Sequence, residues 1–84
     1  MTLHIFQSID SLQRAGACLQ SEDEIVLVGD GTYLALPDTP LRLKAYVLTD
    51  DASLRGLTAT NHFTPIDMAG FVALTAKHPH TLSW

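Results

Sequence analysis

The sequence holds a single cysteine, and this scarcity excludes whole classes of protein. One cysteine cannot form an internal disulfide or a four-cysteine metal site. Fixed cations are also few, with five Lys and Arg against nine Asp and Glu and a net charge of −4. These cations are scattered along the chain, whereas nucleic-acid binding needs clustered Lys and Arg to neutralise phosphates. We therefore expect no direct contact with nucleic acid.

Long apolar runs are missing as well. No stretch approaches the roughly 18 apolar residues that a transmembrane helix needs. The amino terminus has no basic segment followed by an apolar one, as a secretory signal would have. We therefore expect a protein with no membrane segment that works in the cytoplasm.

Cofactor and metal motifs are incomplete. The turn Gly29-Asp30-Gly31 lacks the third glycine of a dinucleotide fingerprint and the Gly-Lys-Ser/Thr ending of a phosphate loop. His78 and His80 flank a proline, and His4 and His62 stand far from them without a Cys or Glu pattern between. The sequence shows no nucleophile elbow around any serine. We expect no metal, no cofactor and no catalytic triad.

What the chain does have is a buried strand at its centre, at residues 25–28. Four consecutive β-favouring apolar residues are typical of a strand that is covered on both faces. Gly29, Asp30 and Gly31 then form a turn, and residues 32–36 predict a short helix that Pro37 stops. Either Thr32 or Asp30 can cap this helix. Asp30 could instead bond the backbone of a partner, and the cap is the interpretation that we favour.

The remaining patterns alternate strands with helices and predict an α/β fold, a three-layer α/β/α sandwich around a small, mostly parallel sheet. A first helix begins at Ser8, Asp10 or Ser11 and buries an apolar stripe from Ile9 to Leu19. Further strands are expected at residues 3–6, 41–48, 63–66 and 81–84. Further helices are expected at residues 52–55, capped from 49–51 and ended by Gly56, and between the cap Asp67 and Pro79.

We interpret residues 1–84 as a single domain with a marginal core. A parallel sheet needs cover on both faces, and so short a chain supplies few helices. We therefore expect a partner to cover part of its apolar surface.

Cys18 is the one candidate sulfur nucleophile. It lies near the carboxyl end of the first predicted helix, where the helix dipole disfavours a thiolate, and it has no Cys-x-x-Cys partner. An inert thiol at the boundary of the core is therefore the favoured interpretation. A persulfide carrier is the alternative.

Several segments in order along the chain resemble the TusB/DsrH family of small sulfur-relay proteins. The most specific of them are Asp30-Gly31-Thr32-Tyr33, Arg55-Gly56-Leu57 and the terminal Ser83-Trp84. The others are Leu3-His4, residues 25–28, Ala45-Tyr46-Val47-Leu48, residues 66–75 and His78-Pro79.

This resemblance implies the DsrE/F/H-like fold and a hetero-oligomer with TusC- and TusD-like subunits, arranged as a dimer of heterotrimers. In that relay, TusD carries the persulfide between TusA and TusE, and MnmA uses the sulfur for 2-thiouridine at the tRNA wobble position. The TusB subunit is accessory. The resemblance gives Cys18 no role.

Three functional hypotheses follow. The first is a non-catalytic subunit of such a sulfurtransferase complex, whose interface candidates are Phe63, Met68, Phe71 and Trp84, unless these residues are simply core. The second is a persulfide-carrying sulfurtransferase that acts through Cys18, as in the DsrEFH-type complexes of sulfur oxidation. The third is a homo-oligomeric domain that binds a small molecule beside Gly29–Gly31, although few polar residues are available to line a pocket there.

Overall fold

The protein forms one sheet of five parallel strands with helices on both faces, as the sequence predicted. The computed structural model describes residues 2–35, 43–57 and 63–84. The strands are β1 (Thr2–Phe6), β2 (Glu24–Leu27), β3 (Lys44–Leu48), β4 (Thr64–Ile66) and β5 (His80–Ser83). The helices are α1 (Ser11–Ala15), α2 (Thr49–Leu54) and α3 (Met68–Lys77), with 3₁₀ turns η1 (Gly16–Cys18) and η2 (Gly29–Ala35).

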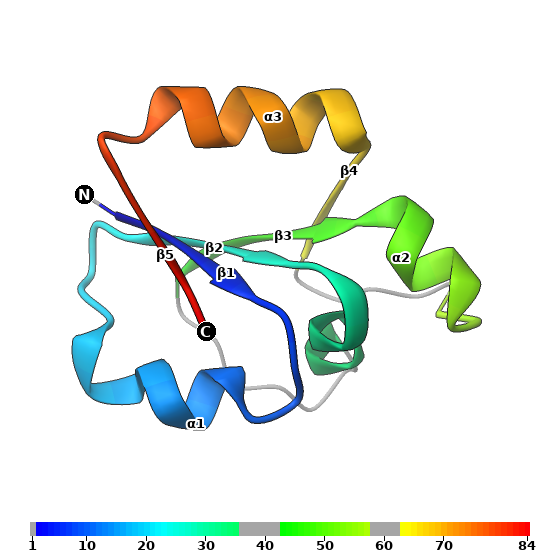
Figure 1. The fold of residues 1–84 in the computed structure, drawn as a ribbon, viewed down its shortest axis with the longest axis horizontal. Coiled ribbons are helices and arrows are strands. Elements are labelled where there is room, and N and C mark those ends of the chain that lie inside the picture. The colour runs from blue at the N-terminus through cyan, green and yellow to red at the C-terminus, as the bar shows by residue number, and fades with distance from the viewer. Residues whose placement is uncertain (1, 36–42, 58–62) are drawn as a thin grey trace.

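The strand order β4-β3-β2-β1-β5 explains why the fold has three layers. From β1 to β4 the chain steps along the sheet in one direction, and from β4 it returns past all the other strands to pair β5 with β1. Crossovers between parallel strands are nearly always right-handed, so steps in opposite directions place their helices on opposite faces. Figure 1 shows this arrangement, with α3 above the sheet and α1 and η2 below it.

Two apolar clusters hold the layers together. Side chains alternate between the faces of a strand, and in β2 Ile25 and Leu27 belong to one cluster while Val26 belongs to the other. The larger cluster includes residues of α1, η2 and α2. In the smaller cluster, α3 contributes Leu74, with Phe71 packed against it. Ile25, Val26 and Leu27 are buried in β2, which confirms three of the four positions predicted from the apolar run, whereas Val28 follows the strand and is half-buried.

The first helix is shorter than predicted. Ser11 Oγ accepts a hydrogen bond from Ser8 N at 3.0 Å, α1 begins at Ser11, and the chain tightens into η1 at Gly16. Ile9 therefore precedes the helix and is 61% exposed, so its assignment to the buried stripe was wrong. The helix predicted at residues 32–36 is instead a 3₁₀ turn that begins at Gly29. The end of that predicted helix, at residues 36 and 37, and the start of the strand predicted at residues 41–48 lie outside the described residues.

In the carboxyl-terminal half, the cap of α3, the edge position of Pro65 and the role of Gly56 are confirmed. The prediction that residues 49–51 cap a helix at 52–55 was wrong, because α2 already begins at Thr49 and no side chain caps it. Asp67 Oδ1 accepts a hydrogen bond from Gly70 N at 2.8 Å and caps α3. Pro65 lies in β4 at the edge of the sheet, where a missing N–H breaks no ladder. Gly56 follows α2 with a positive φ of 71°, as expected of the residue after a helix.

Candidate functional site: the sheet edge and the His4 network

The carboxyl ends of the parallel strands hold the turns from which sites in such sheets are usually built. Here these turns are connected to one another. Asp51, in the first turn of α2, accepts a hydrogen bond from Gly29 N at 2.7 Å. The Thr32 hydroxyl donates to Gly29 O at 2.7 Å. Asp30 is paired with Arg55, with 2.9 Å between Nη2 and Oδ1, so Asp51 and Thr32 rather than Asp30 bond the backbone of this turn.

Gly31 allows the turn after β2 to lie directly against the end of β1. A Cβ atom at this position would stand 2.0 Å from Phe6 O and 2.7 Å from Phe6 C. Gly29 has a different role, because its φ of 53° lies in the left-handed region that favours glycine. The requirement for glycine at position 31 is therefore a close approach of two backbone segments.

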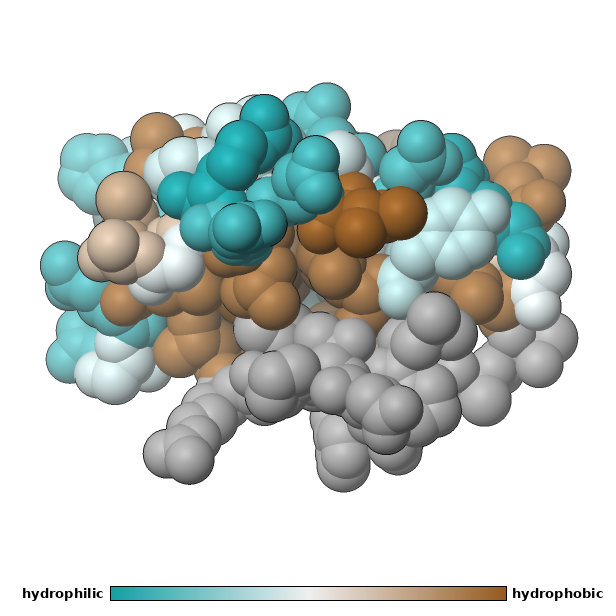
Figure 2. Space-filling model, turned by 90° about the horizontal axis from the view of Figure 1, so that it is seen from below, coloured by the Kyte–Doolittle hydropathy of each residue, from teal (hydrophilic) through white to brown (hydrophobic). Residues whose placement is uncertain are grey.

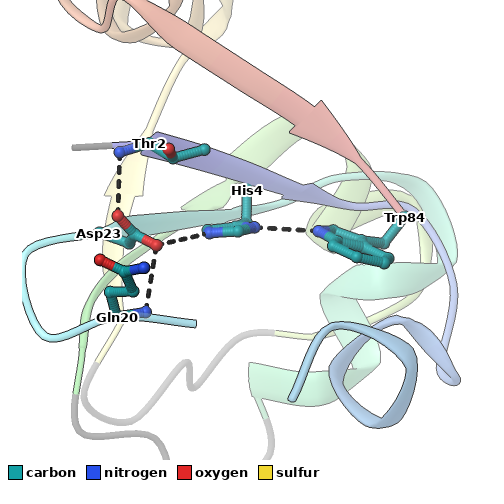
Figure 3. A network of polar contacts seen from close by, with 5 residues as sticks. All are labelled: Thr2, His4, Gln20, Asp23 and Trp84. Atoms are coloured by element: carbon teal, nitrogen blue, oxygen red, sulfur yellow. Dashed lines mark hydrogen bonds and ion pairs between the residues drawn. The ribbon is translucent and has the colours of Figure 1, made fainter. Parts of the chain in front are cut away.

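The most extensive buried polar network centres on His4, in the middle of β1 (Figure 3). The His4 ring is 2.8 Å from Asp23 Oδ2 through Nε2, and Trp84 Nε1 donates to His4 Nδ1 at 3.0 Å. Asp23 also accepts hydrogen bonds from Thr2 N at 3.0 Å and Gln20 N at 3.1 Å. His4 is 1% exposed and Asp23 is 6% exposed, so the two side chains at the centre of the network are shielded from solvent.

The donors and acceptors in this network fix the positions of its protons. An indole nitrogen can only donate, so His4 Nδ1 must accept and the ring proton lies on Nε2, directed at Asp23. Burial by itself would raise the pKa of Asp23. The hydrogen bonds from His4, Gln20 and Thr2 outweigh burial and lower that pKa below its ordinary value of 3.8. Asp23 is therefore a carboxylate at neutral pH.

Trp84 joins this network to the end of the sheet. Its backbone N–H donates to Ile5 O at 2.9 Å and its carbonyl accepts from the Ser11 hydroxyl at 2.9 Å. The indole stacks on His4 with ring centroids 6.2 Å apart. One residue thus connects β1, β5 and α1.

A second buried polar group lies on the opposite face, below α3. His78 Nδ1 is 2.9 Å from Leu74 O, and its Nε2 is 3.0 Å from Glu24 Oε1. Lys77 Nζ approaches the same carboxylate oxygen at 3.8 Å. His78 Nε2 and Glu24 Oε1 lie close together without hydrogen-bond geometry, and the Lys77–Glu24 ion pair joins the carboxyl end of α3 to the start of β2.

The structure separates the residues that the sequence singled out. Cys18 is exposed at the end of η1. Phe63 is buried in the larger cluster, and Phe71 packs partly buried against the smaller one. Trp84 is half-buried in the His4 network, whereas Met68 is 51% exposed on α3.

Exposed apolar side chains occur on several elements. Figure 2, which looks at the α1 side, shows apolar surface between the polar side chains of that face. Among the described residues with large exposed apolar side chains are Ile9, Tyr33 in η2, Leu54 in α2, and Met68 and Val72 in α3.

Among the described residues, no group of three or more His, Cys, Asp or Glu side chains is placed to hold a metal ion. In the same parts of the chain, no helix has the length and apolar character needed to cross a bilayer.

Comparison with known proteins decides the family. A family model described as DsrH like protein matches residues 7–81. The chain belongs to the DsrH family. It is 39% identical over 75 residues to Protein TusB of Escherichia fergusonii, and 37% identical over 75 residues to Protein TusB of Escherichia coli O1:K1 and of Shigella boydii serotype 18. Each alignment covers 79% of this chain and 79% of the relative.

A solved structure agrees with the fold of this DsrH-family chain. The crystal structure of the ychN protein from E. coli aligns with a TM-score of 0.74 and covers 100% of this chain and 99% of that chain. The sequence identity is 11%, so this likeness shows a shared fold. The family and its TusB relatives make the chain a sulfur-relay protein, as the resemblance implied.

The sequence did not reveal the His4 network of this DsrH-family chain. His4 was set aside because no metal-ligand pattern accompanied it, and Asp23 was not among the candidate site residues. One signal was available, a histidine within an apolar strand and an aspartate just before the next buried strand. Parallel pairing of Leu3 with Glu24 and of His4 with Ile25 brings the two side chains together.

Proposed function

We propose that the chain is an accessory, non-catalytic subunit of a TusBCD-type sulfur-relay complex in the cytoplasm, which supports 2-thiolation of the tRNA wobble uridine. TusC- and TusD-like subunits are its partners, and the complex is a dimer of heterotrimers. Family membership supports the class of function. The observation that carries the accessory role is the exposed apolar face of α3.

Helix α3 is more apolar than its place on the sheet requires. Of its ten residues only Leu74 is buried, and Met68 and Val72 are 51% and 58% exposed. No charged residue lies between Asp67 and Lys77, and the other exposed positions of the helix are Ala69, Ala73, Ala76 and Lys77. A helix that is apolar all round is typical of one packed between two layers of protein. We infer that a partner subunit forms the second layer and that Met68 and Val72 contact it.

The remaining interface candidates divide by burial. Trp84 is half-buried, and part of its surface can contribute to an interface. Phe71 supports α3 from below, and Phe63 belongs to the core in this structure.

One observation favours a second candidate function, a persulfide carrier. The Cys18 thiol is exposed, as transfer of sulfur to another protein requires. The accessory role places the persulfide on a cysteine of a partner subunit, whereas the carrier role places it on Cys18.

Co-purification from the native cells, followed by mass spectrometry, tests both. Tagged wild-type chain is compared with Val72→Lys, on the exposed face of α3, and with Leu54→Lys, a matched control whose side chain is 82% exposed on α2. We expect the wild type and Leu54→Lys to bring down two related small α/β subunits with persulfide on their cysteine and none on Cys18. We expect Val72→Lys to lose both subunits while keeping the thermal midpoint of the wild type.

Recovery of the wild-type chain alone would contradict the complex. Persulfide on Cys18 would replace the accessory role by the carrier role. Equal recovery with Val72→Lys would show that α3 is not the interface.

A further inference from the structure

We propose that His4 and Trp84 form a pH-sensitive latch, in which protonation of His4 releases the indole of Trp84 from the sheet. At neutral pH the latch is closed, with the indole donating to His4. When His4 takes up a second ring proton, that hydrogen bond is lost and the indole moves away from β1. The contacts from which this proposal is argued lie within this chain and do not involve the sulfur chemistry.

The argument begins with the two atoms that meet. Trp84 Nε1 carries a hydrogen and has no acceptor lone pair, and it lies 3.0 Å from His4 Nδ1. A protonated imidazole carries a hydrogen on both nitrogens. Two N–H groups would then face each other at hydrogen-bond distance, which turns an attraction into a repulsion. The present geometry is therefore compatible only with the singly protonated ring.

The other groups around His4 determine which partner leaves. Asp23, from the turn before β2, is the charged group that contacts the ring. Its pKa lies below the ordinary value, so it stays ionised wherever histidine titrates, about pH 5 to 8. A doubly protonated His4 keeps its Nε2–H bond to this carboxylate and gains an opposite charge. The indole of Trp84, which is an uncharged side chain and only half-buried, is the partner that moves.

Among residues 2–35, 43–57 and 63–84, Asp23 is the one charged side chain that is paired with His4. In register with His4 are Ile25 on β2 and Leu82 on β5. From α1, Ser11 reaches Trp84 O with its hydroxyl. Glu24, Lys77 and His78 form their own group on the α3 face.

The His4–Trp84 pair lies at β1, where the order in which the chain adds strands to the sheet reverses. The chain leaves β1 toward β2 on one side, and β5 arrives on the other side. Trp84 also keeps this place through its backbone bonds to Ile5 and Ser11, which do not involve His4. We therefore infer that the indole moves first and that the sheet persists.

Trp84 is the only tryptophan, so the intrinsic fluorescence of the full chain reports the latch directly. We expect a reversible red shift of the emission maximum on acidification, as His4 takes up its second ring proton and the indole leaves β1. Far-UV circular dichroism should stay unchanged over the same acidification. In His4→Gln, whose amide offers a donor to Asp23 and an acceptor to the indole without titrating, the emission should not depend on pH.

His80→Gln is the matched control, because His80 is exposed on β5 and contacts neither Asp23 nor the indole among the described hydrogen bonds. Its red shift should equal that of the wild type. A pH-independent wild type, a shift that survives in His4→Gln, or a shift that disappears in His80→Gln would overturn the latch. So would loss of circular dichroism together with the shift, since that would indicate general unfolding.

A second measurement keeps the proposal testable should His4→Gln fold poorly. In nitrogen-15-labelled wild-type protein at neutral pH, we expect His4 to show the tautomer with its proton on Nε2. The Trp84 indole N–H resonance should then shift with the same midpoint as the His4 ring nitrogens. Independent midpoints for the two residues would contradict the latch.

Discussion

Gly31 shows how strictly one residue can be specified by a backbone contact. A methyl group at this position would meet the Phe6 carbonyl, which is held in the β1 ladder and cannot turn aside. We expect Gly31→Ala to lower the free energy of unfolding by on the order of 3–5 kcal/mol, because relief requires β1 and η2 to move apart. Urea denaturation measures this.

Gly16 supplies the control for that substitution. A Cβ there meets nothing within 4 Å, and its φ of −45° is helical. Gly16→Ala should change stability by less than about 1 kcal/mol, with any gain coming from helix propensity and a restricted unfolded chain. Equal losses in the two variants would mean that the contact with Phe6 is not the cause.

Asp23 gives the protein a specific sensitivity to acid. Because its pKa is lower in the folded chain than its ordinary value of 3.8, its stabilising effect is complete above the unfolded-state pKa. That effect is lost as the pH falls through the folded-state pKa. We expect Asp23→Asn to be less stable than the wild type by about 2 kcal/mol at neutral pH, since one amide oxygen replaces a carboxylate that accepts three hydrogen bonds.

The pH dependence separates the charge of Asp23 from its packing. The difference between the wild type and Asp23→Asn should shrink as the pH falls below about 3.8 and through the lower folded-state pKa, because the wild-type carboxyl then becomes protonated. Urea denaturation at several pH values measures the difference. A constant difference would assign the effect to shape alone.

At the scale of the elements, the helix starts differ in how they are capped. Asp67 bonds Gly70 N and caps α3, whereas the first turn of α2 holds Asp50 with no side-chain cap bond. We expect Asp67→Ala to cost about 1 kcal/mol of stability and Asp50→Ala less than about 0.5 kcal/mol. Thermal unfolding of both variants tests this, and equal shifts would show that the cap bond is not what stabilises α3.

Elements defined by local pattern were predictable, and those defined by distant contacts were not. The apolar run of β2 and the cap and stop of α3 can be read from adjacent residues. The turn η2 cannot, because its shape depends on a bond from Gly29 to Asp51, which is 22 positions away. The His4 network was hidden for the same reason, since Trp84 lies 80 positions from His4. Residue spacing describes neighbours in the chain and carries no direct signal for such pairs.

At the scale of the whole molecule, the sheet is wider than the helix α3 that covers one of its faces. Five strands at about 4.8 Å spacing span roughly 20 Å, whereas one helix with its side chains is about 10–12 Å across. Only α3 of the described helices lies above the sheet in Figure 1. The edge residues Thr64, Thr81 and Ser83 are accordingly exposed. This mismatch supports the proposal that a partner completes the layer, as the small size of the chain led us to expect.

The pairing of the first strand with the last has a consequence for synthesis. A ribosome makes the chain from the amino end, so β1 emerges long before β5, with which it pairs in the finished sheet. Until β5 and Trp84 leave the exit tunnel, one edge of β1 has no strand to pair with, and His4 lacks its tryptophan. Contacts so distant in sequence are slow to form. We therefore expect this sheet to close only once β5 is available, with the unpaired edge of β1 exposed to chaperones in the interval.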